Sequence, residues 1–236
     1  MKYMGSKNRY AKELLAIILK DRKPNQWYCE PFVGGCNMID KVDGNRMGSD
    51  NNPYLIACMK QIRDCPQVFP KSNTDCTEET YRDIKNNPHL GDKAAVGYCG
   101  FALSYGGKWF GGWRRDSENK RDYVKEAYNN AIKQSKNLQN LRLHCCDYKK
   151  LNIPKNSIIY CDPPYKDTTK YKDNFNHDEF WDWVRLKDKE GHIIFVSEYE
   201  APDDFECIWS KKVNNSLDKD TGSKQGIEKL FKLRRN

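Results

Sequence analysis

The residues with the clearest chemical potential are Asp162, Pro163, Pro164 and Tyr165, which directly follow the apolar run 157–161. So short a run predicts a buried strand, and open α/β sheets bind ligands at the carboxyl ends of their strands. Because proline lacks an N–H, the Asp162 and Pro163 carbonyls can face a ligand. A carboxylate, a carbonyl and a tyrosine ring suit a planar base that carries an amino group. Taken alone, these four residues fit an acidic turn without a ligand equally well.

A second candidate site follows a predicted strand over residues 27–32. Phe32 leads into the glycine turn 33–37, after which the pattern predicts a helix from about Met38. Glycine lets a ligand come close to the backbone, so strand, glycine turn and helix indicate a nucleotide or nucleoside site. The turn lacks G-x-G-x-x-G and the P-loop lysine, which favours a nucleoside without phosphates.

Acidic residues end two further predicted strands. Asp50 closes the strand 45–50, where a Rossmann-type site binds ribose hydroxyls, although a helix-capping role is the alternative. Asp147 and Tyr148 follow the strand 141–146 and are placed to meet an adenine-like ring by hydrogen bonding and stacking.

Lys7 stands in a third kind of setting. Gly5 and Ser6 precede a predicted helix over 8–20, so exposed backbone N–H groups and the lysine could bind a carboxylate or phosphate. An N-capping turn with a solvated lysine is the alternative.

The alternation of strand and helix stops between residues 64 and 137. Helices are predicted over 77–86 and 120–136, and the stretch 101–115 between them interleaves aromatic residues, glycine pairs and cations. Such a loop could stack on bases and contact phosphates, or it could form an aromatic minicore; both can hold. The candidate DNA-contacting residues are Tyr105, Lys108, Trp109, Trp113, Arg114 and Arg115.

Composition narrows the class of protein. A chain of 236 residues can form one core with an inserted subdomain. A mean hydropathy of -0.94 and the lack of any apolar run near ~20 residues argue against a membrane protein. The ten cysteines are scattered without C-x-x-C pairs, which predicts reduced thiols in a cytosolic protein and no metal site. The net charge of +8 permits a polyanionic partner.

In the order K-Y-M-G-S-K, E-P-F-V-G-G, an acid at 50 and D-P-P-Y, the chain resembles the Dam-type DNA adenine methyltransferases over nearly its whole length. The resemblance implies an α/β fold, a Rossmann-like S-adenosylmethionine methyltransferase sheet with an inserted, mainly helical target-recognition subdomain. The catalytic, cofactor-binding domain would comprise 1–63 and 138–236, and the DNA-binding subdomain 64–137. This insertion is short and rich in glycine and tryptophan, so the GATC specificity of well-known members does not transfer.

The resemblance also assigns residues. It places Lys7 toward the methionine carboxylate of S-adenosylmethionine, Asp50 at the ribose hydroxyls and, more loosely, Asp147 and Tyr148 at the adenine. The implied cofactor-binding residues are Tyr3, Lys7, Phe32, Gly34, Asp50, Asp147, Tyr148 and Asp162. The implied catalytic residues are Asp162, Pro163, Pro164 and Tyr165.

The activity so implied is methyl transfer from S-adenosylmethionine to the 6-amino group of adenine in double-stranded DNA, by base flipping and direct transfer. No metal or covalent enzyme intermediate is needed. We expect a monomer in a bacterial or phage-infected cytoplasm, with any cognate restriction endonuclease on a separate chain. Two alternatives keep the fold: methylation of the 4-amino group of cytosine, or of adenine in RNA. A third, of another class, is a catalytically inactive DNA-binding or regulatory protein.

Overall fold

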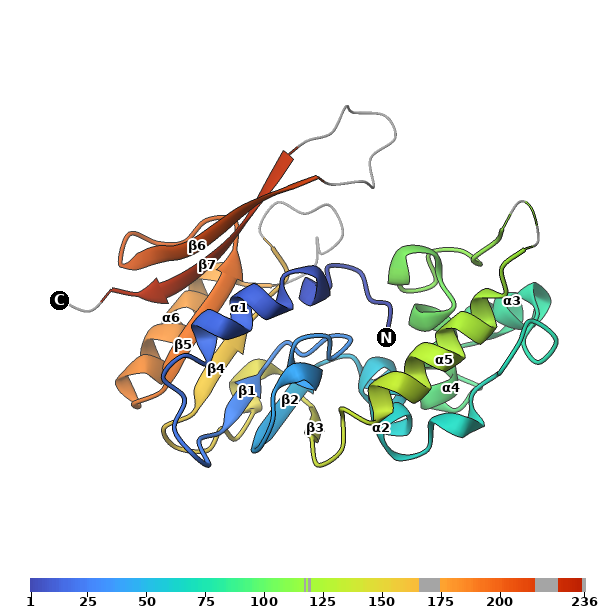
Figure 1. Cartoon of the computed structure of the whole chain (residues 1–236), viewed down its shortest axis with the longest axis horizontal. Helices are drawn as coiled ribbons and strands as arrows, with labels where there is room; N and C mark the ends of the chain where they lie inside the picture. The colour runs from blue at the N-terminus through green and yellow to red at the C-terminus, as the bar shows by residue number, and fades with distance from the viewer. Residues whose placement is uncertain (117, 119, 166–174, 215–224, 235–236) are drawn as a thin grey trace.

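The protein was analysed as a computed structural model, which describes residues 1–116, 118, 120–165, 175–214 and 225–234. Its centre is a seven-stranded sheet with the order β3-β2-β1-β4-β5-β7-β6 (Figure 1). The strands are β1 (Tyr28–Glu30), β2 (Arg46–Asp50), β3 (Arg142–Cys145), β4 (Ile158–Cys161), β5 (Ile193–Glu198), β6 (Phe205–Asn214) and β7 (Gln225–Leu233).

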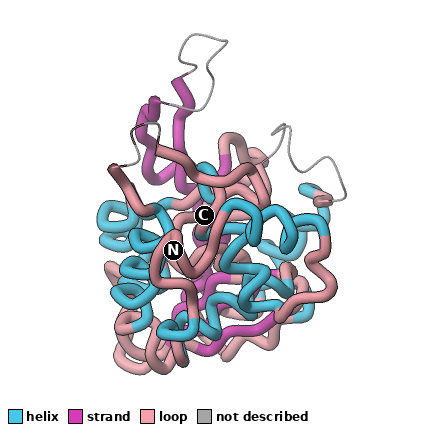
Figure 2. The backbone as a smooth tube through the Cα atoms, turned by 90° about the vertical axis from the view of Figure 1, so that its right-hand side faces the viewer, coloured by secondary structure: helices cyan, strands magenta, loops and turns pink. Residues whose placement is uncertain are grey.

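The first five strands are parallel, and their order is that of a doubly wound α/β sheet. Strand β7 inserts antiparallel between β5 and β6, and the β6–β7 hairpin extends beyond the body of the molecule in both views (Figures 1 and 2). The expected Rossmann-like methyltransferase fold is therefore confirmed. Across the described residues, no helix has both the length and the apolar character needed to cross a bilayer.

Successive side chains of β4 point to opposite faces of the sheet and join two different apolar clusters. Ile158 and Tyr160 join the apolar cluster that contains α1 (Ala11–Ile18) and α2 (Pro53–Asp64). The intervening residues, Ile159 and Cys161, join the cluster that contains α6 (His177–Lys189). A strand buried on both faces is expected in a parallel sheet covered by helices, and it fixes the residues that follow β4 at the sheet edge.

The insertion is helical, as predicted, and lies at the β2–β3 side of the sheet (Figure 1). It contains α3 (Glu78–Asn86), α4 (Lys93–Gly97), a π-helical turn (Tyr98–Ala102) and α5 (Tyr123–Ser135). Its apolar side chains, including Tyr81, Tyr98 and Val124, belong to the same cluster as α1 and α2. The insertion therefore shares its core with one face of the sheet, and its boundaries at 64 and 137 stay a prediction.

The helix expected from Met38 is wrong. Only a 3-10 turn, Ile39–Lys41, follows the glycine turn, and β2 begins at Arg46. Cys36 has a φ of 58°, and Gly44 has a φ of 74° just before β2. Cys36 precedes the expected helix, but Val42 at the end of the turn is extended and Gly44 lies in the left-handed region, so no right-handed helix continues and the chain returns to the sheet at once.

Candidate functional site

The candidate site lies at the edge of the sheet where the carboxyl ends of β1, β2, β3 and β4 meet. Strand order reverses between β1 and β4, which places a topological switch point there. Gly34 follows β1, Asp50 ends β2, Asp147 follows β3 and Asp162 follows β4. The residues predicted from separate motifs thus come from four neighbouring strands.

Lys7 and Asp162 form the centre of the site. Ser6 caps the short helix Lys7–Arg9 by accepting a hydrogen bond from the Asn8 N–H at 3.2 Å. The Lys7 side chain is only 6% exposed, and its Nζ lies 3.3 Å from Asp162 Oδ1 and 3.1 Å from Glu228 Oε2. The same Nζ lies 4.4 Å from the centre of the Tyr165 ring, a cation–π contact. The Tyr165 hydroxyl donates a hydrogen bond to Glu228 Oε2 at 2.9 Å.

Burial controls the electrostatics of this cluster. Burial raises the pKa of Asp162 to about 6 and Glu228 adds to the rise, while the Lys7 ammonium acts in the opposite direction. Burial alone would lower the pKa of Lys7, but Asp162 and Glu228 outweigh it and the pKa is raised. Lys7 is therefore a cation at neutral pH, and Asp162 is ionised above about pH 6.

Asp50 and the glycine turn form the second part of the site. The N–H of Gly34 donates to Asp50 Oδ2 at 3.3 Å, and that of Asn52 donates to Oδ1 at 3.0 Å. Burial raises the pKa of Asp50, and these backbone donors oppose the rise. A carboxylate has about four acceptor positions, and the backbone donors of Gly34, Asn51 and Asn52 occupy up to three of them, so the half-buried Asp50 keeps room for about one further hydrogen bond.

Gly34 is required by its surroundings. Its φ is 49°, and a Cβ there would lie 2.8 Å from Cε1 of the Tyr3 ring. The ring also packs against Phe101 of the insertion, with centroids 5.4 Å apart. Tyr3 thus fills the space between the glycine turn and the insertion.

Aromatic rings form the third part. Phe32 and Phe175 are half-buried, with centroids 5.8 Å apart, while Tyr148 is only 6% exposed and packs 5.1 Å from Phe32. Asp147 accepts a hydrogen bond from the Lys149 N–H at 2.8 Å. The buried Tyr148 therefore packs beneath Phe32 on the protein side, whereas Phe32 and Phe175 are the more exposed rings of the group.

The six candidate DNA-contacting residues separate into two groups. Tyr105 is 62% exposed, Lys108 is exposed, and Arg115 is exposed with its Nε 2.9 Å from Glu78 Oε2. The other three, Trp109, Trp113 and Arg114, make contacts inside the insertion.

Those internal contacts are extensive. Trp109 packs 4.8 Å from Phe101 and Trp113 packs 5.4 Å from Tyr81, as measured between ring centroids. Arg114 is 7% exposed and its Nη2 lies 2.8 Å from Glu126 Oε1. The aromatic minicore considered as an alternative is therefore present.

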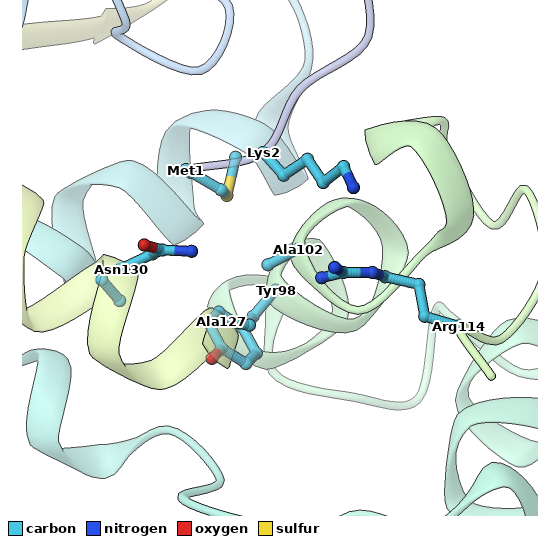
Figure 3. A pocket seen from close by; sticks show the side chains of 8 residues that line it. Met1, Lys2, Tyr98, Ala102, Arg114, Ala127 and Asn130 are labelled. Carbon is cyan, nitrogen blue, oxygen red and sulfur yellow. The ribbon is translucent and has the colours of Figure 1, made fainter. Parts of the chain in front are cut away.

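A small cavity of about 10 Å³ lies apart from Asp162, between the amino-terminal segment and the insertion (Figure 3). Its lining includes Lys2, Tyr98, Arg114 and Asn130, and the buried Tyr98 hydroxyl finds no hydrogen-bond partner among the described residues. The volume suits about one water molecule, so this cavity cannot hold a nucleoside.

Two residues at the site were missed in the sequence. Glu228 interrupts the apolar alternation of a predicted strand, and a charge at an inward strand position was the available signal. Phe175 is one of two aromatic residues in the polar stretch 166–176 before a helix, and its setting gave no usable signal.

Comparison with known proteins identifies the family. The model of the D12 class N6 adenine-specific DNA methyltransferases matches residues 3–193. Among solved structures, a putative methyltransferase yhhF from Escherichia coli is similar over 99% of this chain and 90% of its own, with 11% sequence identity and a TM-score of 0.41. No curated protein sequence matches the chain. Within the described parts of the chain, no group of three or more side chains is arranged to hold a metal ion.

Proposed function

The chain belongs to the D12 class N6 adenine-specific DNA methyltransferases, and from this premise we propose that it binds S-adenosylmethionine at the carboxyl edge of its sheet and methylates an adenine flipped out of duplex DNA. Methyltransferases of this kind use S-adenosylmethionine generally. The observation that carries the proposal is the buried contact of Asp162 with Lys7, beside Tyr165, at the switch point of the sheet.

The donor set at the edge fits the cofactor. Asp50 retains an acceptor position for a ribose hydroxyl, Phe32 and Phe175 offer apolar rings for an adenine, and Asp147 lies on the same edge. Tyr3 and Gly34 form the adjoining wall, with Tyr148 supporting Phe32. When bound, S-adenosylmethionine supplies an electrophilic methyl group on a sulfonium.

The described contacts of Lys7 support a role besides the one that the family resemblance implies. Its ammonium is shared between Asp162 and Glu228. We propose that Lys7 fixes the orientation and charge of Asp162.

In the proposed mechanism, the target base first leaves the duplex stack, at a cost of a few kcal/mol. Tyr165 stacks on the extruded adenine. The Asp162 carboxylate and the Pro163 carbonyl accept hydrogens from its 6-amino group, which turns the nitrogen lone pair toward the methyl group. Pro164 stiffens the turn. Because these acceptors are fixed before the reaction, they stabilise positive charge as it develops on the nitrogen, and alignment of the reactants lowers the barrier further.

The insertion is the proposed DNA-reading part. Tyr105, Lys108 and Arg115 present exposed polar or charged groups, and the chain carries a net charge of +8. We expect it to act as a monomer in a bacterial or phage-infected cytoplasm, where it would meet its DNA. Any restriction endonuclease that shares its recognition site would be a separate chain.

The test is methylation of duplex DNA by the purified protein with labelled S-adenosylmethionine, followed by mass spectrometry of the nucleosides. We expect N6-methyladenine, and Asp162→Ala should reduce incorporation by about 10³-fold, the effect of removing a preorganised group from a polar site. The exposed Asp203→Ala is the matched control.

Other outcomes would change the proposal. Methylcytosine without methyladenine would show that cytosine is the methyl acceptor. Incorporation into RNA alone would show that the substrate is RNA. Incorporation unchanged by Asp162→Ala would show that the catalytic group lies elsewhere. DNA binding without any transfer would favour the inactive regulatory protein.

A further inference from the structure

We propose that Glu228 is a positioning residue for methyl transfer and that its negative charge makes the site prefer the cationic S-adenosylmethionine over the neutral thioether S-adenosylhomocysteine. The inference rests on the cofactor site proposed above. Glu228 lies outside residues 3–193, which the family model matches.

The first step is the geometry of Glu228. Its Oε2 lies 3.1 Å from Lys7 Nζ and accepts the hydrogen bond from the Tyr165 hydroxyl at 2.9 Å. Lys7 in turn lies 3.3 Å from Asp162. The Glu228 carboxylate therefore contacts Tyr165 directly and is linked to Asp162 through Lys7.

The second step is the strand that carries Glu228. Lys229 pairs with Glu198 of β5, and Leu230 pairs with Ser197. Side chains two residues apart share a face of a strand, so Glu228 lies on the face of Leu230, which is fully buried against the sheet core. A carboxylate on an inward face is unfavourable unless it is paired and hydrogen-bonded. Lys7 and Tyr165 supply both interactions.

The third step is the charge of the cluster. With Asp162 ionised, one cation (Lys7) meets two carboxylates (Asp162 and Glu228), so the cluster carries one net negative charge. Another buried acid nearby, Glu30, adds little charge, because burial raises its pKa well above the ordinary value and outweighs the hydrogen bond donated by the Tyr28 hydroxyl, which acts in the opposite direction. Without Glu228 the cluster of Lys7 and Asp162 would be neutral.

The last step concerns the ligand. The reacting methyl must approach to about 3–3.5 Å of the amine that Asp162 orients, so the sulfonium charge must lie near this cluster. A net negative charge in a water-poor site attracts that cation much more strongly than it would in water. The neutral thioether gains nothing from it, and Glu228 therefore favours the reactive form of the cofactor and release of the product.

The test compares the affinity of both ligands for Glu228→Gln without DNA, by isothermal titration calorimetry. Glutamine keeps the shape and an acceptor for Tyr165 but removes the charge. We expect the dissociation constant of S-adenosylmethionine to rise about tenfold, while that of S-adenosylhomocysteine changes by less than about twofold. Glu206→Gln, an exposed glutamate on the same β6–β7 hairpin, should leave both constants unchanged.

An unchanged ratio of the two constants would overturn the inference. Equal weakening of both ligands, including loss of both, would also overturn it, because that result shows a purely structural role. A wild-type protein that binds neither ligand would refute the proposed cofactor site itself, which separates the failure of one proposal from that of the other.

Discussion

Two stretches of this chain combine aromatic and charged residues, and the fold uses them differently. The residues 162–165 directly follow β4, and Asp162 and Tyr165 gather around Lys7 at the open edge of the sheet. The stretch 101–115 of the insertion contains more aromatic rings, yet Trp109 and Trp113 pack inside it. Similar composition thus gives a site in one place and a core in the other.

The difference comes from what fixes each backbone. Strand β4 is buried on both faces, so the next residues must emerge at the sheet edge whatever their side chains do. The strands of the sheet all lie outside the insertion, so its aromatic rings are held by packing against one another and against α2, as Trp109 is on Tyr54. We therefore expect its large rings to contribute to stability first, and its exposed side chains to be the ones that meet DNA.

The strongest test of this contrast is Trp109→Ala. Trp109 packs against Tyr54, Phe101 and Phe110, with ring centroids within 5.3 Å. We expect its removal to lower the free energy of unfolding by about 3 kcal/mol, the lower end of the range for a large aromatic residue because the ring is only partly buried. Urea denaturation followed by circular dichroism measures the change.

Tyr105→Ala is the matched control within the same stretch. Tyr105 is 62% exposed, so its removal should change the free energy of unfolding by less than about 0.5 kcal/mol. If Trp109→Ala weakened DNA binding and left stability unchanged, Trp109 would belong to the DNA-binding surface and the contrast would fail.

A second prediction concerns the pH dependence at the sheet edge. In the proposed mechanism Asp162 must be ionised to accept the amine hydrogens, and burial raises its pKa to about 6. Its protonated fraction grows as the pH falls through this value, so kcat/KM, which reports the free enzyme, should drop about tenfold per unit below it. An unperturbed aspartate, with a pKa near 3.9, would show no such drop above pH 5. Initial rates between pH 5 and 8 at subsaturating DNA measure the effect.

Glu228→Gln provides the control for that profile. Glu228 is one of the causes that raise the pKa of Asp162, so its neutralisation should move the acidic limb to lower pH. A limb that stays in place would mean that another group controls the rate.

The same contrast explains what could be predicted from the sequence. Asp50 and Asp162 were predicted correctly as strand-end residues, because apolar runs locate strands and parallel strands end at one edge. The predicted helix after Met38 was wrong because extended backbone at Val42 and a positive φ at Gly44 end the helical turn at Lys41, and the apolar pattern after Met38 does not reveal this. The glycine turn was therefore recognised while the element after it was not.

The missed Glu228 has a different origin. Its partner Lys7 lies at the opposite end of the sequence, and only the antiparallel insertion of β7 beside β5 brings the two together. Local spacing carries no information about such a pair. The neighbouring arginines of the insertion show the same limit. The buried Arg114 pairs with Glu126 of α5, whereas the exposed Arg115 pairs with Glu78 of α3, and local spacing predicts neither pair.

The smallest expected effect, on salt dependence, decides which side chains of the insertion reach DNA. Each phosphate neutralised by a cation contributes about 0.9 to the slope of log affinity against log salt. Lys108→Ala should lower that slope by about this amount. Arg115→Ala should lower it less, since Glu78 already neutralises part of its charge, and Arg114→Ala should leave it unchanged because its guanidinium is buried against Glu126. Fluorescence anisotropy with a short duplex over a potassium chloride series measures all three.

Should Arg114→Ala reduce the slope as much as Lys108→Ala, the buried arginine must reach phosphate in the complex. The insertion would then rearrange on DNA, and the division between core and contact residues would hold only for the free protein.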